Sequence, residues 1–394
     1  MAKYLVVLSQ PRLVHYRVDL FERMRHLARE RDIDFRLVHG QASALERVKK
    51  DEGELAWADR VNNVFLATIG STDLIWQPTP ASLRQPDLYI TGHESRILSN
   101  YAWLARRLRG GPLVAFWGHG ANLQSKVPNG WRERWKRGLV NQVDYWFAYT
   151  QMSVDILRRA GFDGERITTL NNSIDTSQFR ALCAAVTDKD CAALRNELNI
   201  PLTAPLGVFC GSLYPDKKLD LLVASGDIIR ARQPNFHVVV VGDGPARDYL
   251  AQASRTRPWL HLVGVKFGAE KAAYFRAGQV MLNPGLLGLH ILDAFCAGIP
   301  LVSTSNALHS PEISYLENNV NGLLTAGTPE AYAAGVLQIL EDTGFAQRLI
   351  QKGLEASRLY TVGAMAEQYV DGIARCLQLG RRGAATLVPA ETPP

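Results

Sequence analysis

The chain has 394 residues, of which 47% are hydrophobic and 21% charged, a composition typical of a soluble globular protein with room for two domains. No apolar run reaches the ~18 residues of a membrane-spanning helix, which excludes a helical integral membrane protein. The net charge is +6, and the five cysteines contain no close pair, which disfavours a disulfide framework or a zinc site and favours a reducing cytoplasm.

Short β-branched runs alternate with helical patterns in the first half, which is typical of parallel sheets covered by helices. The run at 4–9 is expected to be a buried strand rather than part of a signal peptide, because no small-residue cleavage site follows it. Further strands are predicted at 35–39, 88–91, 113–117 and 145–149, with helices at 18–31 and 97–108.

The second half repeats this alternation. Strands are predicted at 206–210, 237–241, 261–263, 280–282 and 301–304, and helices at 219–232, 246–256 and 289–297. The chain is therefore expected to form α/β domains over 1–170 and 206–360, with a polar linker at 171–205, a C-terminal helix at 361–379 that crosses back to the first domain, and a disordered tail at 380–394. Two doubly wound domains of this kind place a ligand cleft at the carboxyl ends of their strands.

The stretch 283–303 joins a strand end, a glycine-punctuated loop and a helix start. A glycine loop that opens a helix presents free backbone N–H groups at the positive end of the helix dipole, which favours an anion. Asp293 lies inside this helix, within reach of a hydroxyl on the molecule that carries the anion. The pattern indicates a nucleotide or nucleotide-sugar pocket, although a loop that only turns the chain has the same glycines.

Basic residues are concentrated in the first half. One group surrounds Trp131 and Trp135, which are four residues apart and share a face if the segment is helical. Such a face is suited to an anionic membrane surface, and a solvated helix with two half-buried tryptophans explains it equally well. No nucleic-acid-binding module is present, so nucleic acid is not an expected partner.

Four signatures occur in order along the second half: 171–179 (NNSIDTSQF), 211–222 (GSLYPDKKLDLL), 238–245 (VVVVGDGP), and 283–303 extended by 311–313 and 321–324. On these residues the chain resembles the family-4 glycosyltransferases of the GT-B fold, such as those that build bacterial surface polysaccharides. The resemblance implies two Rossmann-like domains facing each other across a cleft, the first binding the acceptor and the second the nucleotide-sugar.

The implied activity is retaining transfer of a sugar from a nucleotide-sugar donor to a glycan or lipid-linked acceptor, in surface polysaccharide biosynthesis. Retention in this family is described as front-face attack without a covalent protein intermediate. It requires no metal and no cofactor, and the acidic stretch 188–190 is better explained as solvated than as a metal site. The expected location is the cytoplasm, with peripheral binding at the inner face of the membrane as a hypothesis.

The resemblance assigns donor-binding roles in the second domain. Lys217 occupies the position of the family's diphosphate-binding lysine, and Asp293 that of a ribose-binding glutamate. The remaining donor-binding candidates are Gly211, Ser212, Gly288, Leu289 and His290. On spacing alone Lys217 is equally an exposed lysine beside another lysine, and Asp293 a helix-surface carboxylate.

Two positions depart from the family pattern. The first of its paired glutamates falls at Gly285, so a hydroxyl of the transferred sugar loses its carboxylate partner. The arginine after the glycine of the second signature is Ser212, which removes a cation from the diphosphate. One such contact is worth about 3 kcal/mol at a transition state. His290 is a candidate substitute, and a helix-capping or buried histidine is an equal alternative.

In the first domain, the sequence 116–120 (FWGHG) ends a predicted strand with His119, which we identify as the first catalytic candidate. His93 and Glu94 follow the preceding strand and are candidates for the acceptor side. The segment 9–17 replaces the glycine-rich loop frequent in the family, and its side chains are suited either to an acceptor phosphate or to capping a helix: Arg12, His15, Tyr16 and Arg17.

Two alternatives remain open at this point. A catalytically degenerate scaffold of the same fold is suggested by Gly285 and Ser212, whereas the retention of Lys217, Asp293 and His119 together argues against it. A nucleotide-sugar epimerase on the same architecture would act on the donor alone, without any acceptor.

Overall fold

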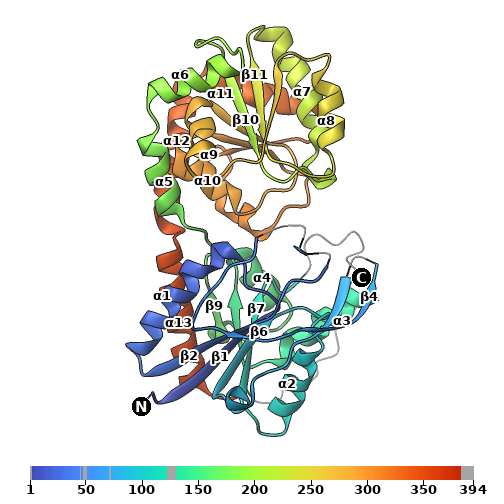
Figure 1. The fold of residues 1–394 in the computed structure, drawn as a ribbon, viewed down its shortest axis with the longest axis vertical. Helices are drawn as coiled ribbons and strands as arrows, with labels where there is room; N and C mark the ends of the chain where they lie inside the picture. Colours follow the sequence, from blue (N-terminus) through green and yellow to red (C-terminus); the bar gives the residue numbers. More distant parts are fainter. Residues whose placement is uncertain (1, 45, 48–50, 71, 122–129, 383–394) are drawn as a thin grey trace. The chain divides into compact units, whose positions relative to one another are not determined.

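The computed structural model describes residues 2–44, 46–47, 51–70, 72–121 and 130–382 (Figure 1). Within it the chain divides into two compact units, which are described separately below. Unit 1 combines Met1–Asn171 with Gly363–Pro394, and unit 2 is Asn172–Val362.

Unit 1 is built on a seven-stranded parallel sheet in the order β3-β2-β1-β6-β7-β8-β9. Most residues of its central strands are buried, as expected for a parallel sheet whose two faces are covered. The strands are β1 (Tyr4–Gln10), β2 (Ile33–His39), β3 (Asp59–Arg60), β6 (Leu88–Gly92), β7 (Leu113–Gly118), β8 (Tyr145–Ala148) and β9 (Ile167–Thr169).

The helices of unit 1 are α1 (Val18–Arg29), α2 (Ser99–Leu108), α3 (Trp131–Leu139), α4 (Gln151–Arg159) and α13 (Val362–Leu379). The C-terminal helix α13 packs closely on β8 and β9 because Gly372 has no side chain. A Cβ at Gly372 would lie 2.6 Å from Thr168 Oγ1 and 2.8 Å from the Phe147 ring. The start of the expected tail is bonded to the same unit, since the Arg382 backbone N–H donates to Asp144 Oδ1 at 2.8 Å. Residues 383–394 lie outside the described part of the chain.

A separate two-stranded antiparallel hairpin, β4 (Val64–Ile69) and β5 (Thr72–Trp76), also belongs to unit 1. The sequence analysis did not predict it. Most of β4 is exposed, whereas Ile75 of β5 is fully buried. The hairpin is therefore attached to the unit mainly through its second strand.

Unit 2 contains a six-stranded parallel sheet in the order β12-β11-β10-β13-β14-β15. The strands are β10 (Leu206–Cys210), β11 (His237–Val241), β12 (Leu260–Gly264), β13 (Val280–Asn283), β14 (Leu301–Thr304) and β15 (Leu323–Thr325). The helices are α5 (Thr176–Ala185), α6 (Asp188–Glu197), α7 (Leu219–Arg232), α8 (Arg247–Ser254), α9 (Gly268–Ala277), α10 (His290–Ala297), α11 (Pro329–Glu341) and α12 (Thr343–Leu359).

The segment expected to be a polar linker, 171–205, instead forms α5 and α6, and both helices pack against α9 within unit 2. Its acidic stretch begins α6: the Thr187 side chain accepts a hydrogen bond from the Asp190 backbone, and the Asp190 carboxylate accepts one from Thr187. This reciprocal cap satisfies two N–H groups that a helix start leaves unpaired. The polar residues therefore start a helix rather than separate two domains.

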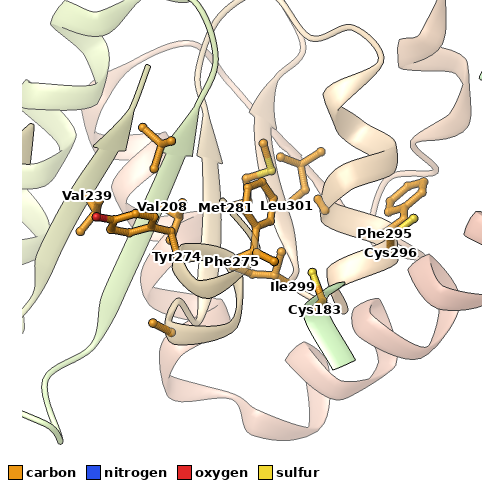
Figure 2. Packing of buried hydrophobic residues seen from close by; sticks show 14 of the residues in the cluster. Cys183, Val208, Val239, Tyr274, Phe275, Met281, Phe295, Cys296, Ile299 and Leu301 are labelled. Atoms are coloured by element: carbon orange, nitrogen blue, oxygen red, sulfur yellow. The ribbon is translucent and has the colours of Figure 1, made fainter. Parts of the chain in front are cut away.

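Apolar side chains cover both faces of the unit 2 sheet. Figure 2 shows the cluster under α5, α9 and α10, in which Cys183 and Cys296 lie among aromatic and branched side chains such as Phe275 and Ile299. The five cysteines are free thiols. In the described ranges, no helix combines the length and apolar character needed to cross a membrane.

The strand order of each sheet reverses at one point, between β1 and β6 in unit 1 and between β10 and β13 in unit 2. In open parallel sheets, ligands bind outside the carboxyl ends of the strands at this switch point. Every candidate site residue of the sequence analysis follows one of these strands or β7, the neighbour of β6, or lies on α10 or its preceding loop.

Candidate functional site

In unit 2, the loops after β10 and β11 touch each other at glycines. A Cβ on Gly242 would lie 1.9 Å from the Gly211 carbonyl oxygen, so no other residue fits at Gly242. Two residues further along the same loop, a Cβ on Gly244 would lie 2.8 Å from the Leu213 backbone nitrogen. These close contacts fix the backbone that follows β10, including the exposed Ser212.

The loop after β13 lies directly against the short 3-10 helix Pro215–Lys217. The Leu286 N–H donates to the Asp216 carbonyl at 2.8 Å. A Cβ on Gly285 would lie 2.3 Å from both the Asp216 oxygen and the Lys217 carbonyl carbon. The position at which the resemblance places a glutamate therefore has no room for a side chain unless the backbone moves.

The Lys217 side chain is held between these loops. It is only 8% exposed, and its Nζ donates to the Leu286 carbonyl at 2.5 Å. A Cβ on Gly211 would be 3.9 Å from Nζ, so the loop after β10 borders the ammonium group on another side. Burial lowers the pKa of Lys217 to about 8, which leaves it mainly charged at neutral pH.

Asn283, at the end of β13, fixes both its own loop and His290. Its Nδ2 donates to the Gly285 carbonyl at 2.9 Å, which directs Oδ1 toward His290. His290 therefore donates through Nε2 to Asn283 Oδ1 at 2.8 Å. Burial, with the nearby charges of Lys217 and Lys271, lowers the pKa of His290 well below its usual value, so its ring is neutral. The sequence allows His290 either to substitute for the absent glutamate or to be a helix-capping or buried histidine, and these contacts match a buried histidine.

A second histidine, His309, supports the loop from the side of β14. Its Nδ1 accepts from the Leu287 N–H at 3.1 Å, and its Nε2 donates to the Thr304 carbonyl at 2.6 Å. Thr304 Oγ1 also donates to the Pro284 carbonyl at 2.7 Å. Gly288 and Leu289, which immediately precede α10, are thus held in place at the positive end of a helix. The start of a helix held in this way is suited to an anion.

Asp293 on α10 is buried and forms an ion pair with Lys271 of α9, whose Nζ lies 2.7 Å from Asp293 Oδ2. Burial raises the pKa of Asp293, and the Lys271 charge opposes that shift. Burial alone would lower the pKa of Lys271, but the Asp293 carboxylate raises it. The Lys271 Nζ also lies 4.5 Å from the centroid of the Phe179 ring. The carboxylate expected to bind ribose is therefore already neutralised by a protein cation.

Sequence reasoning missed Lys271, Asn283 and His309. The charges of Lys217 and Lys271 both contribute to the lowered pKa of His290. Lys271 is itself paired with Asp293, so it offsets that carboxylate and does not replace the cation absent at Ser212. One signal was present in the sequence: a helix turn separates Lys271 from the apolar Phe275, which places this lysine on the buried face of α9.

In unit 1, His119 follows the carboxyl end of β7. Its ring centroid lies 4.2 Å from that of Tyr149, and burial, with Lys136 and Arg17 nearby, lowers its pKa to about 3. The imidazole is therefore neutral at physiological pH, and its ring nitrogens are available as a hydrogen-bond donor and acceptor rather than as a cation. Among the described residues, His119 Nδ1 has no hydrogen-bond partner.

The other two candidates near β6 contact protein groups. His93 is buried between the rings of Phe116 and Trp146, at 5.0 and 4.8 Å, and its Nε2 donates to the Lys136 carbonyl at 3.1 Å. Burial lowers the pKa of His93 to about 3. Glu94 accepts from Arg96 Nε at 2.6 Å. Their role in acceptor binding stays a prediction.

The four candidates after β1 differ in accessibility. Arg12 pairs with Asp51, and the His15 ring lies 3.3 Å from the Asp51 carbonyl. Arg17 is buried, with its guanidinium 5.0 Å from the Trp117 ring centroid and 5.2 Å from that of Tyr16. Tyr16 and His15 are exposed, so they are the two that remain most open to a ligand.

Comparison with known proteins adds independent findings. The family model described as "Glycosyl transferases group 1" matches residues 204–342, a range that contains every unit 2 site residue described above. The D-inositol 3-phosphate glycosyltransferase of Salinispora arenicola is 25% identical over 334 residues, which cover 75% of this chain and 73% of that protein.

Two solved structures share the fold over nearly the whole chain. HepE of Anabaena in complex with UDP has a TM-score of 0.66 at 16% identity, covering 94% of this chain and 99% of that one. Sucrose-phosphate synthase of Thermosynechococcus elongatus also has a TM-score of 0.66 at 16% identity, covering 96% and 100%. These likenesses agree with two Rossmann-like domains, each with its own parallel sheet.

Proposed function

We propose that this chain transfers a sugar from a nucleotide-sugar bound by unit 2 to an acceptor bound by unit 1. The match of residues 204–342 to the glycosyl transferases group 1 family model supports this proposal. One observation carries this proposal: the buried ammonium of Lys217 lies between the loops after β10 and β13, with the start of α10 at the same sheet edge. That edge is the switch point of the unit 2 sheet.

The chemistry of transfer requires such a group. When the glycosidic bond of a nucleotide-sugar breaks, negative charge grows on the distal phosphate of the leaving nucleoside diphosphate. Donors that are already oriented toward that charge stabilise it without reorganisation, and one donor is worth about 3 kcal/mol. Lys217, and the N–H groups near Gly288 and Leu289, are held by protein contacts before any ligand arrives. Lys271 offsets the charge of the Asp293 carboxylate on α10.

The finer parts of the proposal concern stereochemistry and the acceptor. We propose retention of the anomeric configuration, no requirement for a metal, and a glycan or lipid-linked acceptor in surface polysaccharide biosynthesis, presented at an anionic membrane surface. The resemblance of the four signatures supports retention, and the basic character of the first half supports an anionic acceptor side. The name of the Salinispora relative adds a phosphorylated cyclitol as a second acceptor to test.

The degenerate-scaffold alternative loses part of its motivation. Gly285 is required by the close approach of two backbone segments, so the absent glutamate reflects local packing rather than drift. The absent arginine at Ser212 leaves the buried Lys217 as the cation held between the loops after β10 and β13. This retained lysine supports a working transferase.

The decisive experiment is thermal shift of the full chain with UDP, GDP, ADP, CMP and their common sugars. A ligand that binds only the folded state stabilises it by roughly 2.7 kcal/mol at a hundred times its Kd. We expect one nucleoside diphosphate to raise the Tm, and Lys217→Ala to abolish the shift. Lys218→Asn is the matched control, because Lys218 has left-handed backbone (φ +50) that asparagine tolerates. No shift with any nucleotide would favour the scaffold.

With the base identified, the remaining parts are tested with radiolabelled donor. Transfer to a membrane-lipid extract or to a phosphorylated cyclitol distinguishes the acceptors, and conversion of the donor sugar without acceptor would favour the epimerase. Proton NMR of the new anomeric bond tests retention. Unchanged turnover in excess chelator is expected, and a loss that Mg²⁺ restores would contradict the metal-free mechanism.

A further inference from the structure

Large apolar side chains are exposed together on one part of unit 1. They come from the β4–β5 hairpin and from α3, whose labels lie close together in Figure 1. The exposed fractions are 49% for Val64, 56% for Leu66, 49% for Ile69, 40% for Trp76 and 57% for Trp135. We call these five residues the hairpin patch. Soluble monomers rarely expose large contiguous apolar surfaces unless these bind something.

The exposed side chains of β4 do not follow the usual alternation of buried apolar and exposed polar residues along a surface strand. In a hairpin on a protein surface, apolar side chains face the core and polar ones face water. On β4 the side chains from Leu66 to Ile69 are all exposed. Val64 and Trp76 are cross-strand partners, and both are exposed, so this pair points its apolar side chains to the same open face.

A groove joins the hairpin to α3. It has a volume of about 270 Å³ and is lined by Ile69 and Leu74 of the hairpin, Tyr101 of α2 and Trp135 of α3. The Trp135 Nε1–H donates to the Tyr101 hydroxyl at 3.0 Å, which fixes the indole while leaving most of it exposed. Tryptophan and tyrosine with an apolar body and a bonded polar edge are enriched where proteins meet the lipid headgroup region.

Charge indicates which apolar partner the groove meets. Arg134 and Arg137 precede and follow Trp135 in the α3 sequence, lie one helical turn apart from each other, and are both exposed. The α3 sequence WRERWKRGL carries four cations and one carboxylate. Basic side chains beside interfacial aromatic residues favour a surface that is apolar within and anionic at its boundary, which describes a bilayer containing anionic lipid. The side chain of Trp131, the other tryptophan of the predicted basic face, lies outside the described part of the chain.

We propose that unit 1 docks on an anionic lipid bilayer through the hairpin patch, with Trp135 at the headgroup level and Arg134 and Arg137 on anionic headgroups. This docking surface deepens the proposed function, because it is the place where unit 1 would meet an acceptor in a membrane. The docking proposal rests on the proposed membrane-bound acceptor. Bilayer binding itself requires neither donor nor transfer, so the two are measured separately.

The test is flotation of the full chain with phosphatidylcholine vesicles that contain about 30 mol% phosphatidylglycerol, which gives a negative surface potential. Vesicles of phosphatidylcholine alone are the comparison. We expect flotation with the anionic vesicles at low salt and its loss at high salt. Leu66→Ser with Ile69→Ser is expected to lower the partition constant about tenfold or more, since each side chain loses much of its transfer free energy. Leu202→Ser with Leu359→Ser, at equally exposed leucines of unit 2, is the matched control and is expected to float like wild type.

Charge is tested in the same assay. Arg134→Gln with Arg137→Gln is expected to weaken binding about 25-fold, because each basic residue near an anionic surface contributes about fivefold. Arg255→Gln with Arg358→Gln, at exposed arginines of unit 2, is the control for net charge. Bromine-labelled acyl chains are expected to quench tryptophan emission in wild type, and to quench it less in Trp135→Phe.

Several outcomes overturn the proposal. The first is absence of flotation by the wild-type chain, and the second is equal flotation by the Leu66/Ile69 variant and its control. The third is a hairpin variant that dissociates a dimer without changing flotation, because this result would identify a second copy of the chain as the occupant of the patch. Thermal shift by nucleotide is measured on the same samples. A chain that floats but binds no nucleotide keeps the docking surface and contradicts the transferase, and the reverse result contradicts only the docking surface.

Discussion

In both units the candidate residues follow strands near the point where the strand order reverses, but the two sets are held in different ways. In unit 2 the loops are fixed by backbone contacts, such as Leu286 N–H to the Asp216 carbonyl, and Lys217 is held by a single carbonyl. In unit 1 the side chains are themselves engaged: Arg12 by Asp51, and Arg17 by aromatic rings.

This difference has a chemical reason. Most nucleotide-sugars share a diphosphate, and rigid backbone with a desolvated cation would suit that common group if unit 2 binds the donor as proposed. Side chains that pair with one another instead shape a surface peculiar to this chain, as acceptors differ among such enzymes. We therefore expect substitutions in unit 2 to affect stability or nucleotide affinity strongly, and those in unit 1 to affect transfer.

The largest expected effect is at the buried pair of unit 2. Lys271→Met leaves the Asp293 carboxylate buried without its cation, and breaking a buried pair costs about 3 kcal/mol or more of unfolding free energy. The loss should be smallest at acidic pH and grow as the pH rises above the ordinary aspartate pKa of about 3.9, because Asp293 then has to ionise without a partner.

Denaturant unfolding at several pH values measures this effect. Lys266→Met is the control, because Lys266 pairs with the exposed Glu270 at 3.3 Å and should cost less than about 1 kcal/mol. Equal losses in the two variants would contradict the distinction between a buried and an exposed pair.

A smaller loss is expected when a side chain is introduced at Gly285. Even Gly285→Ala should destabilise unit 2 by about 1–3 kcal/mol, because its Cβ would overlap the backbone of residues 216–217. Gly288→Ala is the control, since its Cβ would lie at an ordinary 3.5 Å from Ser310 Oγ. Thermal unfolding checks both, and a stable Gly285→Ala that gains nucleotide affinity would show that the glutamate position is open after all.

The ionisation of Lys217 sharpens the comparison further. Its pKa of about 8 lies below the ordinary lysine value, so nucleoside diphosphate affinity should fall up to tenfold per pH unit above 8, as the ammonium is lost. Because the unfolded chain binds this proton more tightly, the free energy of unfolding of the ligand-free protein should instead rise between pH 8 and 10.5. Calorimetric titration and denaturant unfolding measure the two trends, and neither should persist in Lys217→Ala.

The smallest effect concerns unit 1. His119→Gln is expected to slow sugar transfer about tenfold, by the loss of one hydrogen bond, and to leave nucleoside diphosphate affinity unchanged. Its pKa of about 3 predicts that His119 contributes no ionisation to the pH profile of kcat between pH 5 and 8. A wild-type inflection near pH 6.5 that disappears in His119→Gln would contradict a neutral imidazole.

Much of the fold was predictable because buried parallel strands are apolar runs. The predicted strands at 206–210 and 237–241 and the helix at 219–232 coincide with β10, β11 and α7. The helices α5 and α6 were not predicted, since their polar composition resembles that of a linker and only the cap by Thr187 and the packing on α9 reveal them.

The candidate site was predictable only where a motif names a residue. The reason for Gly285 lies in its contact with a backbone almost seventy residues earlier, and the partner of Asp293 is twenty-two residues away on another helix. Local sequence predicts neither contact, although the spacing of Lys271 from Phe275 indicates that this lysine lies on the buried face of α9. The assignment of site residues to donor, acceptor and catalysis likewise stays a prediction.

The division of the chain also has a consequence for synthesis on the ribosome. Unit 1 begins first but ends last, because α13, which packs on β8 and β9, follows the 191 residues of unit 2 (362 − 171). At roughly 5–20 residues per second, unit 2 emerges over about 10–40 s while the rest of unit 1 waits. During that interval Phe147, on which Tyr369 later stacks at 4.4 Å, has no covering helix. The apolar surface that α13 covers is therefore completed only after all of unit 2 has been synthesised.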